Sequence, residues 1–220
     1  MSKANMIRLQ ATPNTGAELG AFLEVGADLV DRTEPETRRW YALAREGERD
    51  ELAIFDIFAD QAGRQAHFDG QVAAALADKA PQLVQGGWDG VLGNVTNYAT
   101  LAAHEADHGA EIGKATYIAV TAAPGKAAEL AEFLTAGRDV VAQTEPETLY
   151  WVALQSEDQA GRFAIFDLFA DDNGRAAHFG GAVAKALADK ADELVAGGWD
   201  NGVLANVVHF DVRATVRRGE

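Results

Sequence analysis

The order of apolar and polar positions predicts the same series of elements twice along the chain. In the first half, the apolar spacing changes from the alternation typical of strands to that of a helix with one buried face, and back again. Because proline disfavours helix at the residue before it, the long helix is expected to end by Glu34, which precedes Pro35. The predicted elements, in chain order, are a strand Met6–Ala11, a helix from Leu19 to Val30, strands Arg38–Ala44 and Leu52–Phe58, helices Asp60–Phe68 and Gln71–Val84, and a strand Gly90–Tyr98.

The second half repeats the first at a constant offset. The segment Thr33–Thr37, which reads Thr-Glu-Pro-Glu-Thr, returns unchanged as Thr144–Thr148. The motif Ile-Phe-Asp-x-Phe-Ala-Asp, the dipeptide His67-Phe68 and the strand residue Trp40 also return 111 residues later. Solenoid repeats recur every ~20 to 50 residues, so this much longer period indicates a duplicated domain.

Each half therefore has the order β-α-β-β-α-β, which is ferredoxin-like: an antiparallel sheet with helices on one face. The predicted fold class is α+β, with two such repeats whose bare sheet faces can bury each other. We place the first domain at residues 1–100 and the second at 114–214. A linker, 101–113, has no counterpart in the repeat, and 215–220 is expected to be a frayed tail.

Charge and composition narrow the classes of function. The net charge of −15 argues against binding to nucleic acid or to anionic lipid, since both require a basic surface. The chain has no cysteine, which excludes disulfides and thiolate chemistry and fits a cytoplasmic location. The first ten residues lack the features of a signal peptide, and no apolar run approaches the ~20 residues of a membrane span.

The element order, the Glu-Pro turn, the strand residue Trp40, the Ile-Phe-Asp-x-Phe-Ala-Asp motif and the Ala-His-Phe helix together resemble the antibiotic biosynthesis monooxygenase domain, twice over nearly the whole chain. The resemblance implies a dimeric α+β barrel, here formed within one chain, with one pocket per domain between sheet and helices. It also implies oxygenases that need no cofactor and act on polycyclic phenols, anthrones or quinols with molecular oxygen. A monomer with two pockets, or a weak homodimer, is expected.

Haem-degrading members of this group resemble the chain in fold only. They carry a tryptophan on the second helix and a histidine about ten residues later. Here those places fall near His67 and Ala77, so haem cleavage is not expected.

The strongest candidates for chemistry are His67 and His178. Histidine titrates near neutral pH and can act as a general base. In oxygenation without a cofactor, the deprotonated substrate passes an electron to oxygen, so a base, an apolar pocket and oxyanion stabilisation are sufficient. The alternative is that each histidine only hydrogen-bonds backbone near a helix end.

Aromatic and amide side chains are candidates for the substrate pocket. Trp40 and Trp151 could stack on a planar ligand, or simply pack in the core. The remaining pocket candidates are Phe55, Phe166, Trp88, Trp199, Asn94 and Asn206. Trp88 and Trp199 are expected in a loop, where they either wall a pocket or seal an interface between the halves. Asn94 and Asn206 are expected in the last strand, as donors to a substrate oxygen or in a loop or bulge role.

Asp56 and Asp167 are single acids in apolar strands. A buried carboxylate needs a partner. Arg64 and Arg175 follow eight residues later, so we predict structural pairs Asp56–Arg64 and Asp167–Arg175, with a catalytic acid as the alternative.

One motif points to a different class of site. The run His104-Glu105-Ala106-Asp107-His108 matches H-E-x-x-H, which on a helix can bind zinc. It lies in the predicted linker, lacks a downstream third ligand and has no copy in the second half, so we interpret it as a chance match and predict no metal site.

The leading hypothesis from the sequence is a cofactor-independent monooxygenase that acts on an aromatic, polyketide-like or quinol molecule. The alternatives are a small-molecule binding or stress-related protein without turnover, and an isomerase or cyclase that uses the histidine without oxygen.

Overall fold

The computed structural model describes residues 2–106 and 109–218 of the chain. The chain divides into two compact units: unit 1, Met1–Tyr98 with Phe210–Glu220, and unit 2, Ala99–His209. In the described part of the chain, no helix combines the length and the apolar character needed to cross a membrane.

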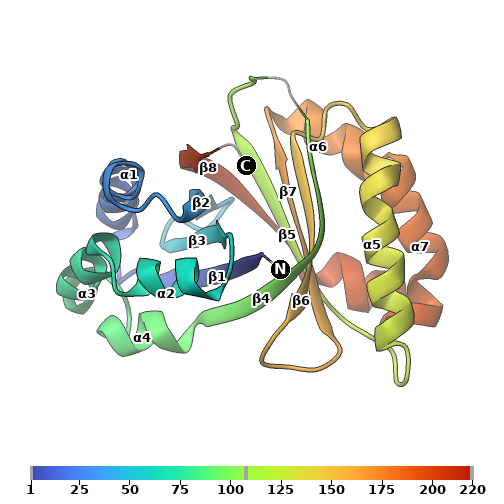
Figure 1. Cartoon of the computed structure of the whole chain (residues 1–220), viewed down its shortest axis with the longest axis horizontal. Helices are drawn as coiled ribbons and strands as arrows, with labels where there is room; N and C mark the ends of the chain where they lie inside the picture. The colour runs from blue at the N-terminus through green and yellow to red at the C-terminus, as the bar shows by residue number, and fades with distance from the viewer. Residues whose placement is uncertain (1, 107–108, 219–220) are drawn as a thin grey trace. The chain divides into compact units, whose positions relative to one another are not determined.

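Unit 1 follows the predicted series of elements with one addition (Figure 1). Its elements are β1 Lys3–Gln10, α1 Gly16–Thr33, β2 Thr37–Arg45, β3 Glu51–Phe58, α2 Gln61–Phe68, α3 Gln71–Leu83, α4 Gly87–Gly93 and the start of β4 Val95–Glu105. Asp60 caps the start of α2, because its carboxylate accepts a hydrogen bond from the Gly63 N–H.

Unit 2 repeats this series. Its elements are the end of β4, β5 Lys114–Thr121, α5 Ala127–Thr144, β6 Tyr150–Ser156, β7 Arg162–Phe169, α6 Asp172–Phe179, α7 Ala182–Leu194, the π-helical turn η1 Gly198–Val203, the 3-10 turn η2 Leu204–Asn206 and the start of β8 Val207–Arg217. The end of β8 belongs to unit 1, just as the end of β4 belongs to unit 2.

The strands are antiparallel, with β3 between β1 and β2 in unit 1 and β7 between β5 and β6 in unit 2. Within the described residues, the hydrogen-bonded strand order β1-β3-β2-β8-β5-β7-β6-β4 is that of a closed barrel. The predicted α+β class, with two repeats in one barrel, is therefore confirmed.

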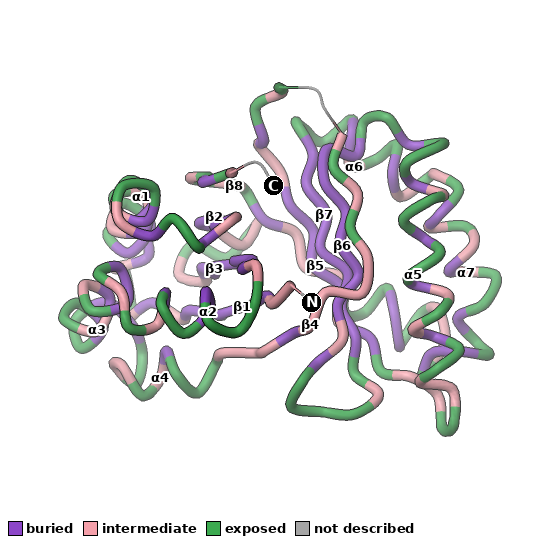
Figure 2. Tube along the Cα trace, in the orientation of Figure 1, coloured by how far each residue is buried: buried purple, intermediate pink, exposed green. Residues whose placement is uncertain are grey.

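The core of each unit lies between its strands and its two long helices. In unit 1, Trp40 on β2 packs with Leu23 of α1 and Leu76 of α3, and the strands are buried along most of their length (Figure 2). In unit 2, Gly137 on α5 lets the helix approach the tryptophan, because a Cβ there would lie 3.2 Å from the Trp151 ring. Burying a side chain of this size contributes a few kcal/mol, so these contacts fix the helices over the sheet.

The register places Asp56 on the face that carries the helices. Its neighbours across the sheet are Asn5 on β1 and Trp40 on β2, and Trp40 belongs to the helix-facing core. Since β3 is buried on both faces from Leu52 to Phe58, the carboxylate has no path to bulk water along its own strand. The sheet thus holds an acid beneath α2.

The predicted strand Gly90–Tyr98 is wrong in its first part. Gly86 and Gly87 adopt left-handed backbone with φ of 78° and 59°, and the chain then turns into the short helix α4. The strand starts only at Val95. α3 ends at Leu83 with Val84 extended, and the two glycines after it lead into a second helix rather than a loop.

The predicted linker and tail are corrected at their edges. Residues 101–105 continue β4, and 215–217 continue β8. Residues 99–105 include no fully buried position, so the alternation that marks a strand is weak there. The hydrogen bond from the Ala106 N–H to the Leu149 carbonyl shows instead that this stretch is held by strand pairing.

Candidate functional site

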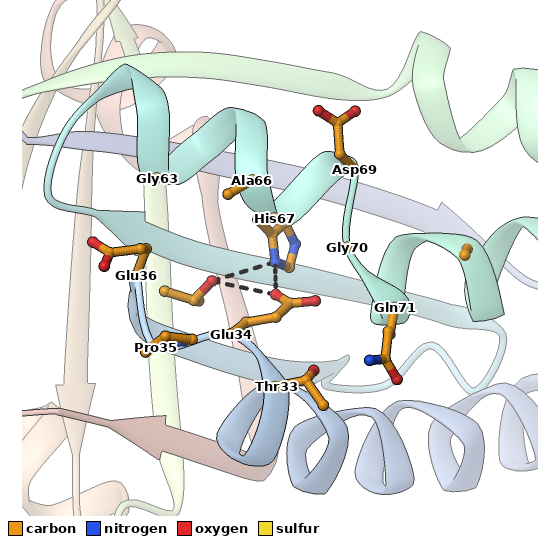
Figure 3. Close-up of a pocket in the computed structure, with 12 residues that line it drawn as sticks. Thr33, Glu34, Pro35, Glu36, Gly63, Ala66, His67, Asp69, Gly70 and Gln71 are labelled. Atoms are coloured by element: carbon orange, nitrogen blue, oxygen red, sulfur yellow. Dashed lines mark hydrogen bonds and ion pairs between the residues drawn. The ribbon is translucent and has the colours of Figure 1, made fainter.

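Four polar side chains from four segments of unit 1 meet at the end of α2. Glu34 caps the C-terminus of α1, and Thr37 is the first residue of β2. Asp56 comes from β3, and His67 comes from the last turn of α2. Pro35 ends α1, and the Thr37 N–H then donates to the Glu34 carbonyl, which closes a turn and brings both side chains to His67 of α2. Figure 3 shows Glu34 facing His67 across this turn.

The imidazole of His67 lies between two carboxylates. Its Nδ1 is 2.5 Å from Glu34 Oε2, and its Nε2 is 3.4 Å from Asp56 Oδ2. The Thr37 hydroxyl lies 3.3 Å from the same Glu34 oxygen and 3.4 Å from His67 Nδ1. The other Glu34 oxygen accepts from the Val72 N–H at the start of α3, so the carboxylate is fixed at both ends.

Unit 2 has the same arrangement. His178 Nδ1 is 2.6 Å from Glu145 Oε2, and His178 Nε2 is 3.6 Å from Asp167 Oδ2. The hydroxyl of Thr148 lies 3.2 Å from His178 Nδ1, and the Val183 N–H donates to Glu145 Oε1. We call the two sets the Glu–His–Asp clusters: Glu34, Thr37, Asp56 and His67 in unit 1, and Glu145, Thr148, Asp167 and His178 in unit 2.

A glycine beside each cluster lets the glutamate approach. A Cβ on Gly70 would lie 2.6 Å from Glu34 Oε1, and a Cβ on Gly181 would lie 2.6 Å from Glu145 Oε1. Both glycines stand just before a helix, α3 or α7, whose second residue donates its N–H to that glutamate. Any larger residue would displace the carboxylate from its histidine.

Burial and neighbouring charge set the proton affinities in unit 1. Complete burial raises the pKa of Asp56 to about 7, although the charges of His67 and Arg64 oppose this. Burial alone would lower the pKa of His67, but the hydrogen bond with Glu34 and the charge of Asp56 raise it overall. Asp56 therefore exchanges a proton near neutral pH beside a histidine that holds its own proton more tightly than free imidazole does.

The same balance holds in unit 2. Burial raises the pKa of Asp167 to about 7, opposed by His178. Burial alone would lower the pKa of His178, but Asp167 and Glu145 raise it overall. For Glu145, burial alone would raise the pKa, yet the hydrogen bonds from His178 and the Val183 N–H lower it. Each cluster can thus take up or release one proton close to physiological pH.

A pocket borders each cluster. In unit 1 a pocket of about 340 Å³ lies between the Glu-Pro turn (33–37) and the segment from Gly63 to Ala74, with Glu34, Thr37 and His67 in its lining. The exposed carboxylates of Glu36 and Asp69 lie at different edges of it (Figure 3). The matching pocket in unit 2 is about 220 Å³ and includes Glu145, Thr148 and His178. Ligand pockets usually span about 300–1,000 Å³, so unit 1 is the better candidate.

The tryptophans of the second strands do not line these pockets. Trp40 and Trp151 are 0% and 1% exposed, and both belong to the hydrophobic cores. Phe55 and Phe166 are fully buried and, as strand neighbours of the aspartates, face the side of the sheet away from the clusters. The core-packing alternative therefore holds for Trp40 and Trp151, and the pocket prediction for the two phenylalanines is corrected.

The residues after the double glycines lie on short helices rather than in a loop or strand. Trp88 on α4 and Trp199 in η1 are half-buried and pack against the core of their own unit. Asn94 caps α4 by donating to the Gly90 carbonyl at 2.8 Å, and Asn206 donates to the Gly202 carbonyl at 2.9 Å. The two asparagines therefore terminate helical turns, and neither lines the pocket beside its cluster.

Each buried aspartate lies against a histidine. The predicted Asp–Arg pairs are not hydrogen-bonded, because the carboxylate oxygens of Asp56 and Asp167 have no hydrogen-bond partner among the described residues. Arg64 donates to the Tyr98 carbonyl at 2.8 Å and to Gln61 at 3.1 Å, while its charge acts on Asp56. Arg175 donates to Asp172, 2.5 Å away on the same helix. Each short helix carries both the histidine and the arginine. Their spacing from the aspartate in the sequence therefore does not show which of the two side chains contacts it.

The H-E-x-x-H match lacks its helix. His104 and Glu105 belong to strand β4, while Asp107 and His108 lie outside the described residues. Among residues 2–106 and 109–218, no group of three or more histidine, cysteine, aspartate or glutamate side chains has the arrangement of a metal site.

The sequence does not identify Glu34 and Thr37, or their copies Glu145 and Thr148, as site residues, because the end of a helix alone accounts for the Thr-Glu-Pro-Glu-Thr segment. The available signal was its identity in both halves, including a glutamate that a helix-ending proline does not require.

Comparisons with known proteins bear on the fold. No family model and no curated protein matches this sequence. A solved structure called "putative monooxygenase" from Fusobacterium nucleatum subsp. nucleatum ATCC 25586 aligns with a TM-score of 0.83, covering 99% of this chain and 95% of that chain at 15% identity. The chain has the fold of this protein.

Two further structures agree. A "putative monooxygenase" from Lactobacillus acidophilus NCFM gives a TM-score of 0.74 over 99% of this chain and 97% of that chain, at 12% identity. An anthrone oxidase-like protein gives a TM-score of 0.62 over 100% of this chain and 94% of that chain, at 13% identity. The resemblance to a tandem antibiotic biosynthesis monooxygenase domain is therefore confirmed as a monooxygenase-like fold over both halves; identities this low carry the likeness no further than the fold.

Proposed function

We propose that this protein is a cofactor-independent monooxygenase that acts on a small aromatic phenol, anthrone or quinol, with His67 and His178 as general bases. The observation that carries the proposal is the Glu–His–Asp cluster, which is built twice and borders a pocket each time. The monooxygenase-like fold supports the reaction class. The chemistry requires a group that accepts a proton near pH 7, and the clusters supply one.

The proposed reaction balances without a further reductant. His67 takes a proton from a ring CH₂ or hydroxyl, and the resulting anion gives one electron to O₂. The substrate radical and superoxide combine to form a C–O bond, and the proton held by His67 returns to the peroxide. Loss of water then breaks the O–O bond and leaves a carbonyl, so R₂CH₂ and O₂ give R₂C=O and H₂O.

Each residue of the cluster has a distinct role in this proposal. Glu34, 2.5 Å from Nδ1, orients the imidazole and raises its proton affinity. Asp56, with a pKa of about 7, holds a proton in exchange with Nε2. Thr37 fixes the Glu34 oxygen that the histidine uses. Because the unit 1 pocket is larger, we expect it to carry most of the turnover.

The surroundings proposed for this reaction follow from the family resemblance and from composition. We expect a cytoplasmic protein that works as a monomer or weak homodimer, with molecular oxygen as co-substrate and no bound cofactor. The net charge of −15 supports a small-molecule substrate over nucleic acid or membrane partners.

Oxygen uptake by metal-stripped protein, measured against a panel of anthrones, naphthols and quinols, tests the proposal. We expect uptake that requires substrate, falls by about 100-fold or more in a His67→Ala/His178→Ala variant, and falls further in His67→Ala than in His178→Ala. His104→Ala, which removes a histidine from β4, is the matched control and should behave as wild type. Uptake that persists in the double variant would remove the histidines from the mechanism.

A binding protein without turnover is the second candidate, and one observation favours it. Both ring nitrogens of His67 face carboxylates, so a substrate must compete with Glu34 or Asp56 for the imidazole. For this candidate we expect the panel to quench tryptophan fluorescence without consuming oxygen. Substrate loss without oxygen uptake would instead indicate an isomerase or cyclase that uses the same base.

A further inference from the structure

The side chain of Arg218 lies across the C-terminus of α1. Its Nη1 donates to the Thr37 carbonyl at 2.6 Å, and its Nη2 donates to the carbonyls of Asp31 at 2.6 Å and Val30 at 3.1 Å. The Asp31 carboxylate is 3.3 Å from the same nitrogen. One guanidinium thus joins the last turn of α1 to the first residue of β2.

These contacts enclose the segment that builds the unit 1 cluster. Val30 and Asp31 precede Glu34 in the chain, and Thr37 follows it. Helix C-termini present carbonyls without intrahelical partners, and a cation there is favourable both as a donor and towards the helix dipole. Because the planar fork reaches carbonyls on both sides of the Glu-Pro turn, Arg218 holds that turn closed, and with it the Glu34 and Thr37 side chains that contact His67.

The matching position in unit 2 has no such side chain. The Arg218 N–H donates to the Arg38 carbonyl, and the Ala106 N–H donates in the same way to the Leu149 carbonyl. Arg38 and Leu149 are equivalent in the repeat, 111 residues apart. Ala106 therefore occupies the place of Arg218, and its methyl group offers no donor to the end of α5.

We propose that Arg218 is a positioning residue of the unit 1 site, which fixes Glu34 and Thr37 against His67 and makes this site differ from its copy in unit 2. The charged groups that face His67 are Glu34, from the end of α1, and Asp56, on β3, with Arg64 of α2 acting on Asp56. β2 contributes the neutral Thr37. The catalytic consequence rests on the proposed function, but the positioning does not.

Titration of the histidine ring signals by NMR tests the positioning. In Arg218→Ala, the pKa of His67 should fall, because a loosened Glu34 no longer holds the hydrogen bond that raises it, while His178 should titrate as in wild type. Arg217→Ala removes an exposed neighbouring arginine of β8 and should change neither histidine. An unchanged His67 titration in Arg218→Ala would overturn the proposal.

A conservative variant guards against misfolding. Arg218→Lys keeps a cation but replaces the guanidinium with one ammonium group. The pKa of His67 should therefore fall in this variant too, but by less than in Arg218→Ala. If Arg218→Ala does not give a folded circular dichroism spectrum, the lysine variant decides by the same criterion, and an unchanged His67 there rejects the proposal.

Turnover separates this inference from the proposed function. In a His178→Ala background only the unit 1 site operates, and adding Arg218→Ala should lower kcat by up to about 100-fold, as expected when a catalytic group is misplaced. In a His67→Ala background the same change should have no effect on kcat, and an equal loss in both backgrounds would contradict a role specific to unit 1. If wild type turns over nothing, the proposed function fails, while the titration still decides the role of Arg218.

Discussion

Replacing Asp56 with asparagine should remove a large part of the pH dependence of this protein's stability. Asp56 is completely buried on β3, and its pKa is about 7 rather than the ordinary 3.8. Between about pH 4 and pH 7 the folded protein therefore holds a proton at this position that the unfolded chain has already lost. Asparagine has nearly the same size and carries no charge at any of these pH values, so it removes the titration while filling the same space.

The sign and size follow from linkage. A group whose pKa is raised on folding stabilises the folded state most below its unfolded pKa, and this contribution is lost as pH rises through the folded pKa. At about 1.4 kcal/mol per pH unit, the change from 3.8 to about 7 amounts to about 4 kcal/mol, of which about 3 kcal/mol is lost between pH 5 and pH 8. The raised pKa of His67 acts in the same direction.

Urea unfolding of wild type and Asp56→Asn, followed by circular dichroism and tryptophan fluorescence from about pH 5 to about pH 8, measures this difference. As pH rises over that range, the free energy of unfolding of the variant should increase relative to that of wild type by about 3 kcal/mol. Asp69→Asn, at an exposed carboxylate on the adjoining segment, is the control and should show no such trend. A free-energy difference between Asp56→Asn and wild type that does not change with pH would refute the reasoning.

Two further changes test the packing around the cluster. Gly70→Ala should lower the free energy of unfolding by about 1–3 kcal/mol and lower the pKa of His67, because its Cβ would lie 2.6 Å from Glu34 Oε1. Gly93→Ala is the control, because a Cβ there would have no atom within 4 Å. Equal urea midpoints for the two variants would contradict the account. Trp40→Phe should lower the free energy of unfolding in urea by about 2 kcal/mol but leave the affinity for naphthol unchanged, since the side chain is 0% exposed and outside the pocket lining. A loss of naphthol affinity with unaltered stability would place Trp40 in the site after all.

Much of the fold could be predicted because the apolar periodicity agrees with the residues that begin and end helices in this chain. Pro35 ends α1 where expected, Asp60 caps α2, and the repeat carries every prediction from one half to the other. The errors fall where local signals are weak or ambiguous. A double glycine indicates that a helix ends but does not reveal the next element, so α4 was missed, and the exposed end of β4 has no apolar alternation to reveal a strand.

The site was predicted only in part, for a different reason. His67 and Asp56 could be named from residue type and repetition, but their partners depend on which side chains the fold brings together. Glu34 lies 33 residues before His67, and only the path of the turn places its carboxylate 2.5 Å from the ring. Arg64 was the natural sequence neighbour for Asp56, yet its guanidinium also donates to the backbone carbonyls of Ala4 and Tyr98.

The most direct test of the central claim is to run the reaction under oxygen-18 gas and to determine the mass of the product by mass spectrometry. We predict that one labelled oxygen atom enters the product and that the other leaves as water, with labelling lost in the His67→Ala/His178→Ala variant and kept in His104→Ala. A product that carries no label, or one formed equally well by the double variant, would contradict the proposed mechanism.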